Sequence, residues 1–398
     1  MKEVAVAGIG MYPWGKFPDI SVHQMATIVV QEALKDANMS WKDVQLVVAG
    51  EDPWSGIPGL LMGSMLSNNL GGRGIPIINV YNACATGGYA LKTAQAYINS
   101  GFCDIVLCFA ASKSPAGFFG VTQVKEDDPN DVDTQRFRVL GKTNPTNFAM
   151  LASRRMALYG TTEEDLALVK VKNSKHGSLN PRARYKKVFT MEEVLNSPMV
   201  AYPLRLFEIC ATSDGAAAVV LCSMDVAKKF NTKPITLVSI GAASPKYPDP
   251  DIDFARDFGS DFSEDPPPGE NAMGQGTAKV AYEEAGIGPE DLSFAEVYDL
   301  SSPSELQWYE DIGLCKPGEG EKLLREGATA LGGRIPVCPS GGCSCFGEAI
   351  PAQALSQACE LVWQLRGDAG ERQVEGAKVG FAINAGKQGN CSAMIMKK

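Results

Sequence analysis

The chain has 398 residues, 45% of them hydrophobic, and a formal net charge of −9. This length suits two core units of about 150 to 200 residues each, and because no apolar run approaches about 18 residues, we expect a globular protein without a membrane span. The negative charge disfavours binding to nucleic acid and anionic membranes, and eleven cysteines without framework spacing predict free thiols in a reducing, cytoplasmic compartment.

The start of the chain is predicted to alternate strands and helices. Residues 4–8 read as a first strand, and Ser21 is placed to cap a helix whose apolar residues recur on one face. A helix stop at Ala37 precedes a turn and a buried strand that ends near Gly50. The acidic third residue and the early glycines argue against a signal peptide.

The stretch that contains Cys84 changes character in its middle. An apolar, β-branched run over 75–80 predicts a buried strand, and after Asn82 the apolar residues recur at helical spacing. Cys84 is therefore predicted at a junction between strand and helix, where free N–H groups and a partial positive charge stabilise a thiolate. We predict that Cys84 is a nucleophile and that the small residues around it leave room for a substrate: Ala83, Ala85, Gly87 and Gly88. The alternative is a buried structural cysteine.

The motif Asn82-Ala83-Cys84-Ala85-Thr86-Gly87-Gly88 resembles the nucleophile motif of the thiolase superfamily, in the branch related to the sterol carrier protein type thiolases. The resemblance spans nearly the whole chain. It implies the α/β thiolase fold, in which two similar βαβαβ-type halves pack into five layers, α/β/α/β/α.

An internal duplication supports this fold independently. The order of helix, turn and buried strand at 37–50 recurs at 284–298, and the glycine-rich residues 71–76 are mirrored by 332–336. Buried strands of this kind need helices on both faces, so the duplication predicts two similar α/β halves. We expect an N-terminal half over 1–111 and 198–232, a loop insert over 112–197, and a C-terminal half over 233–398.

The insert carries a basic cluster in an otherwise acidic protein. The cluster follows a helix that is predicted to start near Thr162, and it consists of Arg182, Arg184, Lys186 and Lys187. These side chains either bind the phosphates of coenzyme A, which the resemblance implies as a substrate, or form a solvated face. Both interpretations remain open from the sequence.

The family places its catalytic groups on four segments, and this chain carries a counterpart of each. Cys84 is the nucleophile of the first segment. Tyr298 stands in the second segment at the position of an oxyanion histidine, and Glu348 stands in the third at the position of the histidine that activates the nucleophile. In the fourth, the N–H of Gly386 is expected to join that of Cys84 in an oxyanion hole.

The chain departs from the family pattern at several of these segments. Leu300 replaces the second catalytic cysteine, Lys387 occupies a usual glycine position, and Ser174 replaces a histidine of the insert, with His176 two residues on. A carboxylate beside Cys84 would raise the pKa of the thiol unless burial protonates it, so Glu348 is expected to act on the substrate or to share a proton with the thiol.

Tyr298 has a phenol that can donate a hydrogen bond to a substrate carbonyl oxygen. The alternative interpretation of Tyr298 and Glu348 is loss of function. A metal site is not predicted, because the spacing of Cys338, Cys343 and Cys345 does not match zinc pairs and the chain has only two histidines.

Two subgroups with altered histidines resemble this pattern: the steroid side-chain aldolases and the thiolase subunit of benzoylsuccinyl-CoA thiolase. Because Cys84 is present with only one of the aldolase tyrosines, the resemblance favours catabolic retro-Claisen cleavage of a bulky β-ketoacyl-CoA by free CoA, through an acyl-Cys84 intermediate. Aromatic loops suggest the size of the substrate; they contain Trp14, Trp54, Phe118 and Phe119. The alternatives are a retro-aldol lyase that uses Tyr298 or Glu348, and a noncatalytic scaffold.

The resemblance also implies partners. We expect a homodimer with the strand through Asn79 and Val80 near the two-fold axis. Both subgroups work with a small subunit that carries a zinc ribbon and an OB fold, so we expect a similar subunit here. The acidic stretch 249–270 is the expected docking surface.

Overall fold

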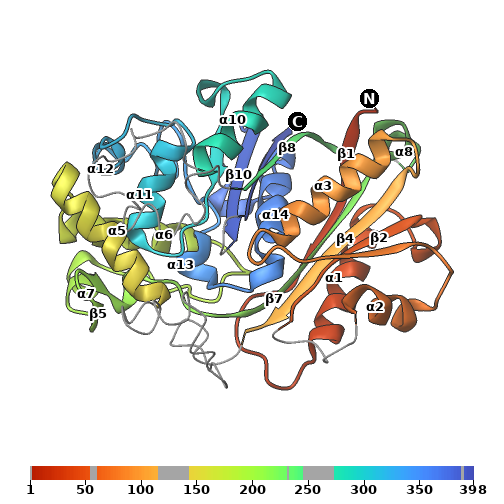
Figure 1. Ribbon diagram of the computed structural model, residues 1–398, viewed down its shortest axis with the longest axis horizontal. Coiled ribbons are helices and arrows are strands. Elements are labelled where there is room, and N and C mark those ends of the chain that lie inside the picture. The colour runs from red at the N-terminus through yellow and green to blue at the C-terminus, as the bar shows by residue number, and fades with distance from the viewer. Residues whose placement is uncertain (1, 54–60, 115–142, 231–232, 245–272, 387–389) are drawn as a thin grey trace, which may run out of the picture.

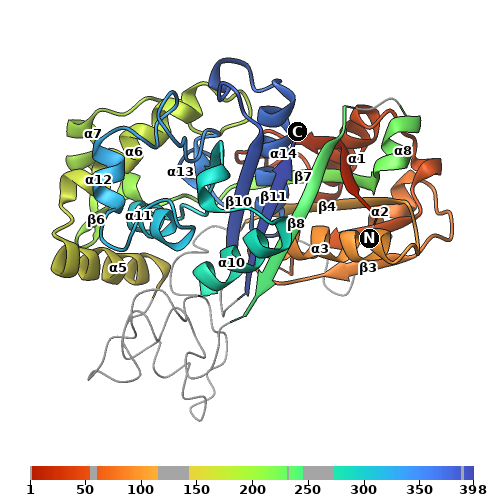
Figure 2. The same cartoon turned by 90° about the horizontal axis from the view of Figure 1, so that it is seen from above.

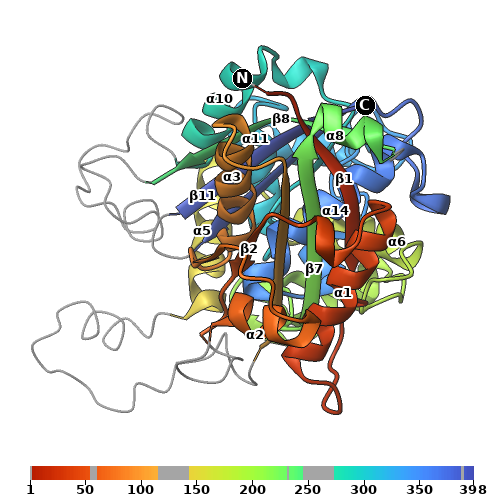
Figure 3. The same cartoon turned by 90° about the vertical axis from the view of Figure 1, so that its right-hand side faces the viewer.

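The computed structural model describes residues 2–53, 61–114, 143–230, 233–244, 273–386 and 390–398, and Figures 1 to 3 show it from three directions. The main-sheet strands are β1 (Val4–Met11), β2 (Leu46–Gly50), β3 (Ile77–Val80), β4 (Ile105–Lys113), β7 (Asp214–Ser223), β8 (Ile235–Ala243), β9 (Phe294–Glu296), β10 (Val379–Gly386) and β11 (Asn390–Lys397). A separate small hairpin consists of β5 (Met199–Ala201) and β6 (Leu204–Arg205).

Helices connect these strands along the chain. They are α1 (Val22–Asp36), α2 (Met62–Leu70), α3 (Thr86–Asn99), α5 (Asn144–Tyr159), α6 (Glu163–Ser178), α7 (Met191–Leu195), α8 (Met224–Lys229), α10 (Met273–Ala285), α11 (Ser302–Asp311), α12 (Gly320–Arg325), α13 (Gly342–Phe346) and α14 (Gln353–Arg366). Trp54, Phe118, Phe119, Lys387 and the acidic stretch 249–270 lie outside the described residues. Among those described, no helix combines the length and the apolar character that a membrane crossing needs.

The predicted helix starts at Ser21 and near Thr162 are confirmed. Ser21 Oγ accepts the N–H of Gln24, while the Gln24 side chain accepts the N–H of Ser21. Thr162 and Asp165 make the same reciprocal pair at the start of α6. Each pair satisfies two N–H groups that a bare helix end would leave without partners, so the local sequence determines where these helices begin.

The main sheet has nine strands in the order β3-β2-β4-β7-β1-β8-β11-β10-β9. From the central pair β1 and β8, the strands follow the order β1-β7-β4-β2-β3 towards one edge and β8-β11-β10-β9 towards the other. Ala295 of β9 also forms a bridge to Val337, so the segment at Val337 takes the place of a fifth strand on that side. Within the described part of the sheet, β1 and β8 pair at Ala5 opposite Thr236 and at Val6 opposite Ile235, and this pairing joins the two half-sheets. This mirrored order is the arrangement that a duplicated unit predicts.

The predicted five layers are confirmed by the way side chains alternate between cores. Val6 of β1 and Ala382 of β10 point into one core shared by both halves, whereas Ala5 packs under α1 and Phe381 packs in the outer core with α10. Helices α3 and α14 contact each other and strands of both halves, and they lie between β10 and β4 in Figure 1. The five layers are therefore, in order, α1 with α2, the part of the sheet from β1 to β3, α3 with α14, the part of the sheet from β8 to β9, and α10 with α11.

The segment predicted as an insert packs against the C-terminal half. Helix α6 contacts α11, α12 and α13, and α5 contacts α11 and the β5–β6 hairpin; these elements gather on the left of Figure 1. The insert therefore supports the segments around Tyr298 and Glu348, which adjoin α11 and α13. The domain boundaries themselves stay a prediction.

Candidate active site

Cys84 lies in a tight turn between β3, which ends at Val80, and α3, which begins at Thr86. The Thr86 hydroxyl donates to the carbonyl of Ala83 at 2.5 Å and accepts the N–H of Asn82 at 2.8 Å. Ala83 has a φ of +48°, a conformation that non-glycine residues rarely adopt. The predicted junction between strand and helix is confirmed, and the hydroxyl of Thr86 holds the turn that presents Cys84.

The two glycines after Cys84 serve helix packing. A Cβ on Gly88 would lie 1.9 Å from Ser392 Oγ, and one on Gly87 would lie 2.9 Å from the Leu355 nitrogen. The space beside them is filled by β11 and α14. The interpretation that the small residues around Cys84 leave room for a substrate is therefore wrong for Gly87 and Gly88, because these glycines permit the close contact of α3 with its neighbours.

Three of the predicted site residues meet at one carboxylate oxygen. Cys84 Sγ donates to Glu348 Oε1 at 2.8 Å, and the hydroxyl of Tyr298 donates to the same oxygen. Their exposed fractions are 9% for Cys84, 1% for Glu348 and 4% for Tyr298. The three side chains come from the turn before α3, the loop after α13 and the loop after β9, so only the folded chain brings them together.

The backbone of Glu348 is fixed from both sides. Its N–H donates to the carbonyl of Ala211 at 2.7 Å, and its own carbonyl accepts the N–H of Ser213 at 2.8 Å and the hydroxyl of Ser114 at 3.1 Å. The loop after α13 is thus tied to the residues before β7 and after β4. This support fixes the backbone from which the carboxylate reaches Cys84.

Burial is the main cause of the pKa shifts of Glu348 and Tyr298. It raises the pKa of the Glu348 carboxyl above its ordinary value, and the hydrogen bonds from Cys84 and Tyr298 offset only part of this increase. Burial, followed by the nearby Cys84 and Glu348, raises the pKa of the Tyr298 phenol well above its usual range. Tyr298 is therefore a hydrogen-bond donor at neutral pH, and Glu348 titrates closer to the range of a thiol than an exposed carboxylate does.

Gly386, at the end of β10, lies against the Cys84 turn. A Cβ on this residue would be 2.5 Å from the carbonyl oxygen of Asn82 and 3.2 Å from the nitrogen of Ala85. Glycine is required for this approach of two backbones. The contact places Gly386 beside the turn that carries the Cys84 N–H, and their joint role as an oxyanion hole stays a prediction.

The basic cluster makes contacts of its own. Arg182 forms an ion pair with Glu32 at 2.5 Å, and its guanidinium lies over the ring of Trp363. Arg184 donates to the carbonyl of Thr212 at 2.5 Å, and Lys186 donates to the carbonyl of Pro181 at 2.9 Å. Lys187 forms an ion pair with Glu193 at 2.7 Å. None of these contacts involves Cys84, Tyr298 or Glu348. The structure therefore leaves coenzyme A binding by this cluster as a prediction.

His176 has a structural position. Its Nδ1 lies 2.9 Å from the carbonyl oxygen of Cys338, and its Nε2 accepts the N–H of Leu331 at 3.0 Å. Burial, followed by the nearby Lys172, lowers the pKa of His176 to about 3. The ring is neutral and both nitrogens are engaged, so His176 fixes the path of the chain and supplies no proton to the site.

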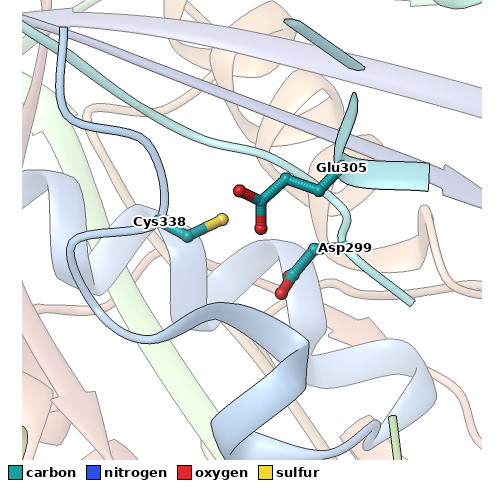
Figure 4. A group of neighbouring side chains, drawn as sticks. All are labelled: Asp299, Glu305 and Cys338. Atoms are coloured by element: carbon teal, nitrogen blue, oxygen red, sulfur yellow. The ribbon is translucent and has the colours of Figure 1, made fainter. Parts of the chain in front are cut away.

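One buried group within the described part of the chain has metal-ligand chemistry: Asp299, Glu305 and Cys338, shown in Figure 4. Lys172 Nζ lies 2.5 Å from Glu305 Oε1, so an ammonium already neutralises this carboxylate. Asp299 accepts the N–H groups of Cys343 and Ser344 at 2.6 and 3.1 Å. These contacts fit a structural network that ties the Tyr298 loop to α13.

Sequence reasoning missed two further thiols beside Cys84. Cys210 and Cys343 are buried in one apolar cluster with Cys84, Tyr298 and Ile350. Cys343 precedes Glu348 by five positions in the third family segment. Position within that segment was the signal that could have identified it, whereas Cys210 becomes a neighbour only through tertiary contacts.

Comparisons with known proteins agree along the whole chain. A model of the thiolase N-terminal domain matches residues 4–225, and a model described as thiolase C-terminal domain-like matches residues 260–397. The chain is 35% identical over 402 residues to an acetyl-CoA acetyltransferase of Methanothermobacter thermautotrophicus, with 99% of each chain covered. It is 34% identical over 376 residues to the benzoylsuccinyl-CoA thiolase subunit BbsB of Thauera aromatica, covering 94% of this chain and 92% of that protein.

A solved structure described as the Ltp2-ChsH2(DUF35) aldolase has a similar fold. The TM-score is 0.80 at 24% sequence identity, and the match covers 99% of this chain and 97% of the other. At this identity the likeness supports the fold alone. Together with the two matching domain models, it confirms the fold that the Cys84 motif predicted.

Proposed function

Because the chain belongs to the thiolase family and is an acyltransferase of that family, we propose that it cleaves a bulky β-ketoacyl-CoA with free CoA through an acyl-Cys84 intermediate. The observation that carries this proposal is the contact of 2.8 Å between Cys84 Sγ and Glu348 Oε1. A thiol and a proton acceptor of raised pKa, placed at hydrogen-bond distance in a buried turn, form an activated nucleophile.

The cleavage proceeds in two stages. Cys84 gives its proton to Glu348, and the thiolate attacks the β-keto carbon of the substrate, so that a C–S bond forms. The bond between the α- and β-carbons then breaks, its electron pair forms the enolate of the leaving thioester, and the acyl group stays on Cys84. The proton held by Glu348 passes to the α-carbon of this enolate. Free CoA then attacks the acyl group, the proton of its thiol passes to Glu348, and the departing Cys84 thiolate takes that proton back. The N–H groups of Cys84 and Gly386 stabilise the oxyanion in both stages.

We propose that the substrate is larger than acetoacetyl-CoA. The relative from Thauera aromatica is named as a thiolase for benzoylsuccinyl-CoA, which suggests an aromatic acyl group for this chain. Trp14 is not available to contact an acyl group of the substrate, since its side chain is 2% exposed and packs edge-on against Phe346. Trp308 lies nearer the site, where its Nε1 donates to the carbonyl of Tyr298 at 2.8 Å and its ring packs against the cluster around Cys84.

We propose that the basic cluster receives the phosphates of coenzyme A. Lys187 is the best placed of the four to change partner, because its side chain is 60% exposed and its ion pair with Glu193 is shared with solvent. Such a surface pair contributes little to stability, so exchanging the carboxylate for a phosphate costs little.

A second candidate function is retro-aldol cleavage of a β-hydroxyacyl-CoA. The hydrogen bond between Tyr298 and Glu348 favours it, since a phenol and a carboxylate that share a proton can remove the hydrogen of a β-hydroxyl group. This reaction consumes no CoA and leaves no adduct on Cys84. The need for free CoA and the presence of an adduct on Cys84 therefore distinguish thiolysis from the retro-aldol reaction.

We propose a homodimer formed through β3, with a small zinc-ribbon/OB-fold subunit attached. β3 is the edge strand of the main sheet, and all four of its residues, Ile77 to Val80, are only half-buried, so a second copy would cover them. For the small subunit, the support is that BbsB is named as a subunit and that the structural neighbour is named as an Ltp2-ChsH2(DUF35) assembly.

The test is a panel of β-ketoacyl-CoAs assayed with and without free CoA, together with a β-hydroxyacyl-CoA. Acetoacetyl-CoA represents small substrates and benzoylacetyl-CoA represents aromatic ones. We expect cleavage of benzoylacetyl-CoA that requires free CoA. Preference for acetoacetyl-CoA would contradict the substrate class, and CoA-independent cleavage of the hydroxy compound would establish the lyase instead.

A further inference from the structure

Glu348 can accept the proton of Cys84 only while its carboxylate stays at hydrogen-bond distance from the thiol. A short segment before β7 holds the backbone of Glu348 in place. Its N–H donates to the carbonyl of Ala211 at 2.7 Å, its carbonyl accepts the N–H of Ser213 at 2.8 Å, and Thr212 forms a parallel bridge with it. The position of this segment therefore determines where the carboxylate lies.

The same segment packs closely against the loop that carries Glu348. Gly347 has a φ of +75°, and a Cβ on it would lie 2.4 Å from Ser213 Oγ and 2.7 Å from the carbonyl oxygen of Ala211. The hydroxyl of Ser213 also donates to the carbonyl of Phe346 at 2.6 Å. Because the two backbones leave no room for a side chain between them, a displacement of the segment moves Glu348 as well.

Arg184 of the insert binds this segment from a third part of the chain. One of its guanidinium nitrogens, Nη1, donates to the carbonyl of Thr212 at 2.5 Å and to the hydroxyl of Ser213 at 3.2 Å. The guanidinium lies over the ring of Tyr185, 4.6 Å from its centre, and the N–H of Tyr185 donates to the carbonyl of Cys345 at 2.9 Å. These two neighbours thus connect the insert to both segments that meet at the carboxylate.

Arg184 differs in this respect from the lysines of the basic cluster. Lys186 and Lys187 are exposed, whereas Arg184 is half-buried and its guanidinium donates to groups inside the protein. A charged donor makes a stronger hydrogen bond to a carbonyl than a neutral one does, and a planar guanidinium keeps a fixed direction. The contacts of Arg184 therefore suit support of the chain better than capture of a phosphate.

We propose, on the basis of the function proposed above, that Arg184 is a positioning residue for the base: it holds Thr212 and Ser213 so that Glu348 stays at hydrogen-bond distance from Cys84. Burial and the two side-chain hydrogen bonds that Glu348 accepts account for the shift of its pKa. Arg184 therefore acts through the backbone rather than through its charge. Its loss should slow the proton transfer without changing the pH at which Glu348 ionises.

The experiment measures transfer of a benzoyl group from benzoyl-CoA to Cys84 in the full-length chain, by rapid quench at several pH values. Arg184→Ala removes both contacts. We expect the maximal rate to fall about 10- to 100-fold, while the benzoyl-CoA concentration that gives half of this rate changes less than about threefold. The pKa of the rising limb of the pH profile should stay in place.

Two kinds of rescue separate positioning from a general effect on stability. Guanidinium chloride at millimolar concentration should restore part of the rate of Arg184→Ala, because the free cation can occupy the space of the lost side chain. Arg184→Lys should lose less than the alanine variant, because an ammonium also donates hydrogen bonds. Circular dichroism establishes that the variants fold.

Arg205→Ala is the matched control. Arg205 also donates to a backbone carbonyl, that of Ser197 at 3.3 Å, and it pairs with Glu163 at 3.1 Å, but none of these contacts involves the segments that hold Glu348. This variant should keep the wild-type rate and should not respond to guanidinium.

Several results would overturn the role of Arg184. A raised half-saturating concentration with an unchanged maximal rate would assign Arg184 to coenzyme A instead. Equal losses in Arg184→Ala and Arg205→Ala, or no rescue by either guanidinium or lysine, would show a general effect on the fold. A wild-type chain that takes up no benzoyl group refutes the proposed function, whereas normal acylation of Arg184→Ala refutes the role of Arg184 alone.

Discussion

Glu348 controls the reactive thiol because burial and two hydrogen bonds act on it in opposite directions. Burial raises the pKa of its carboxyl, while the donors Cys84 and Tyr298 lower it. Sequence reasoning identified Glu348 and Tyr298 by their place in family segments, and the structure brings both to Cys84. The sequence alone did not show that both donors share one oxygen, since that depends on three loops meeting in space.

The pH dependence of Cys84 acylation tests this balance. Glu348 accepts the thiol proton only when it is ionised, so the acylation rate should rise with pH through a pKa above the ordinary value of 4.5. Tyr298→Phe removes a hydrogen bond that lowers this pKa, so the rising limb should move to still higher pH. Rapid-quench measurements with benzoyl-CoA follow the rate. A limb that moves to lower pH, or stays in place, would show that Tyr298 does not act through Glu348.

At the scale of elements, the packing of α3 between the two halves depends on glycine. Gly88→Ala places a Cβ 1.9 Å from Ser392 Oγ, so either α3 or β11 has to move. We expect a loss of roughly 1 to 3 kcal/mol in the free energy of unfolding, together with slower acylation because Cys84 lies at the start of this helix. Urea denaturation and the benzoyl-CoA reaction provide the two measurements.

Gly276→Ala is the matched control for this variant. Gly276 lies inside α10, and its φ is not in the left-handed region. Among the described residues, no atom outside the local helix backbone lies within 4 Å of the Cβ that it would gain. Alanine favours a helix interior over glycine, so this substitution should stabilise the chain by about 0.5 to 1 kcal/mol. Equal effects of the two substitutions would contradict the account of close packing at Gly88.

Local patterns predicted elements well and contacts between elements poorly. The break in periodicity at Asn82 located the turn before α3, and the Ser21 cap located α1, because both signals act over a few residues. The role of Gly87 and Gly88 was misread, since Leu355 and Ser392 approach from segments more than 260 residues away in the chain. Cys210 was missed for the same reason, since only tertiary contacts bring it into the apolar cluster with Cys84.

At the scale of the whole molecule, the internal repeat predicted two halves and the sheet order agrees with it. The pairing of β1 with β8, which makes one continuous sheet of the two halves, could not be predicted from the sequence. Only two residue pairs form it, and the residues of a strand do not indicate which other strand will pair with its edge. The outer edge of the sheet at β3 is where the proposed dimer is expected to form.

Introducing a negative charge beside β3 tests whether the proposed dimer forms through this strand. Tyr81 is 45% exposed at the end of this strand, and in a two-fold dimer formed through β3, Tyr81→Glu places like charges close to each other. We expect wild-type chain to sediment as a dimer and this variant to shift towards monomer. Tyr202→Glu changes a tyrosine that is 66% exposed beside the β5–β6 hairpin, away from β3, and should leave the dimer intact. A dimer that is lost in both variants, or in neither, would contradict the β3 interface.

The central claim is that Cys84 carries the acyl group, and peptide mass spectrometry after one turnover tests it most directly. Benzoylacetyl-CoA is mixed with an excess of protein in the absence of free CoA, and the digest is examined for the Cys84 peptide. We predict a benzoyl adduct on Cys84 that free CoA removes, and neither adduct nor cleavage with Cys84→Ala. Full cleavage by Cys84→Ala, or turnover by the wild-type chain without any adduct on Cys84, would contradict the account.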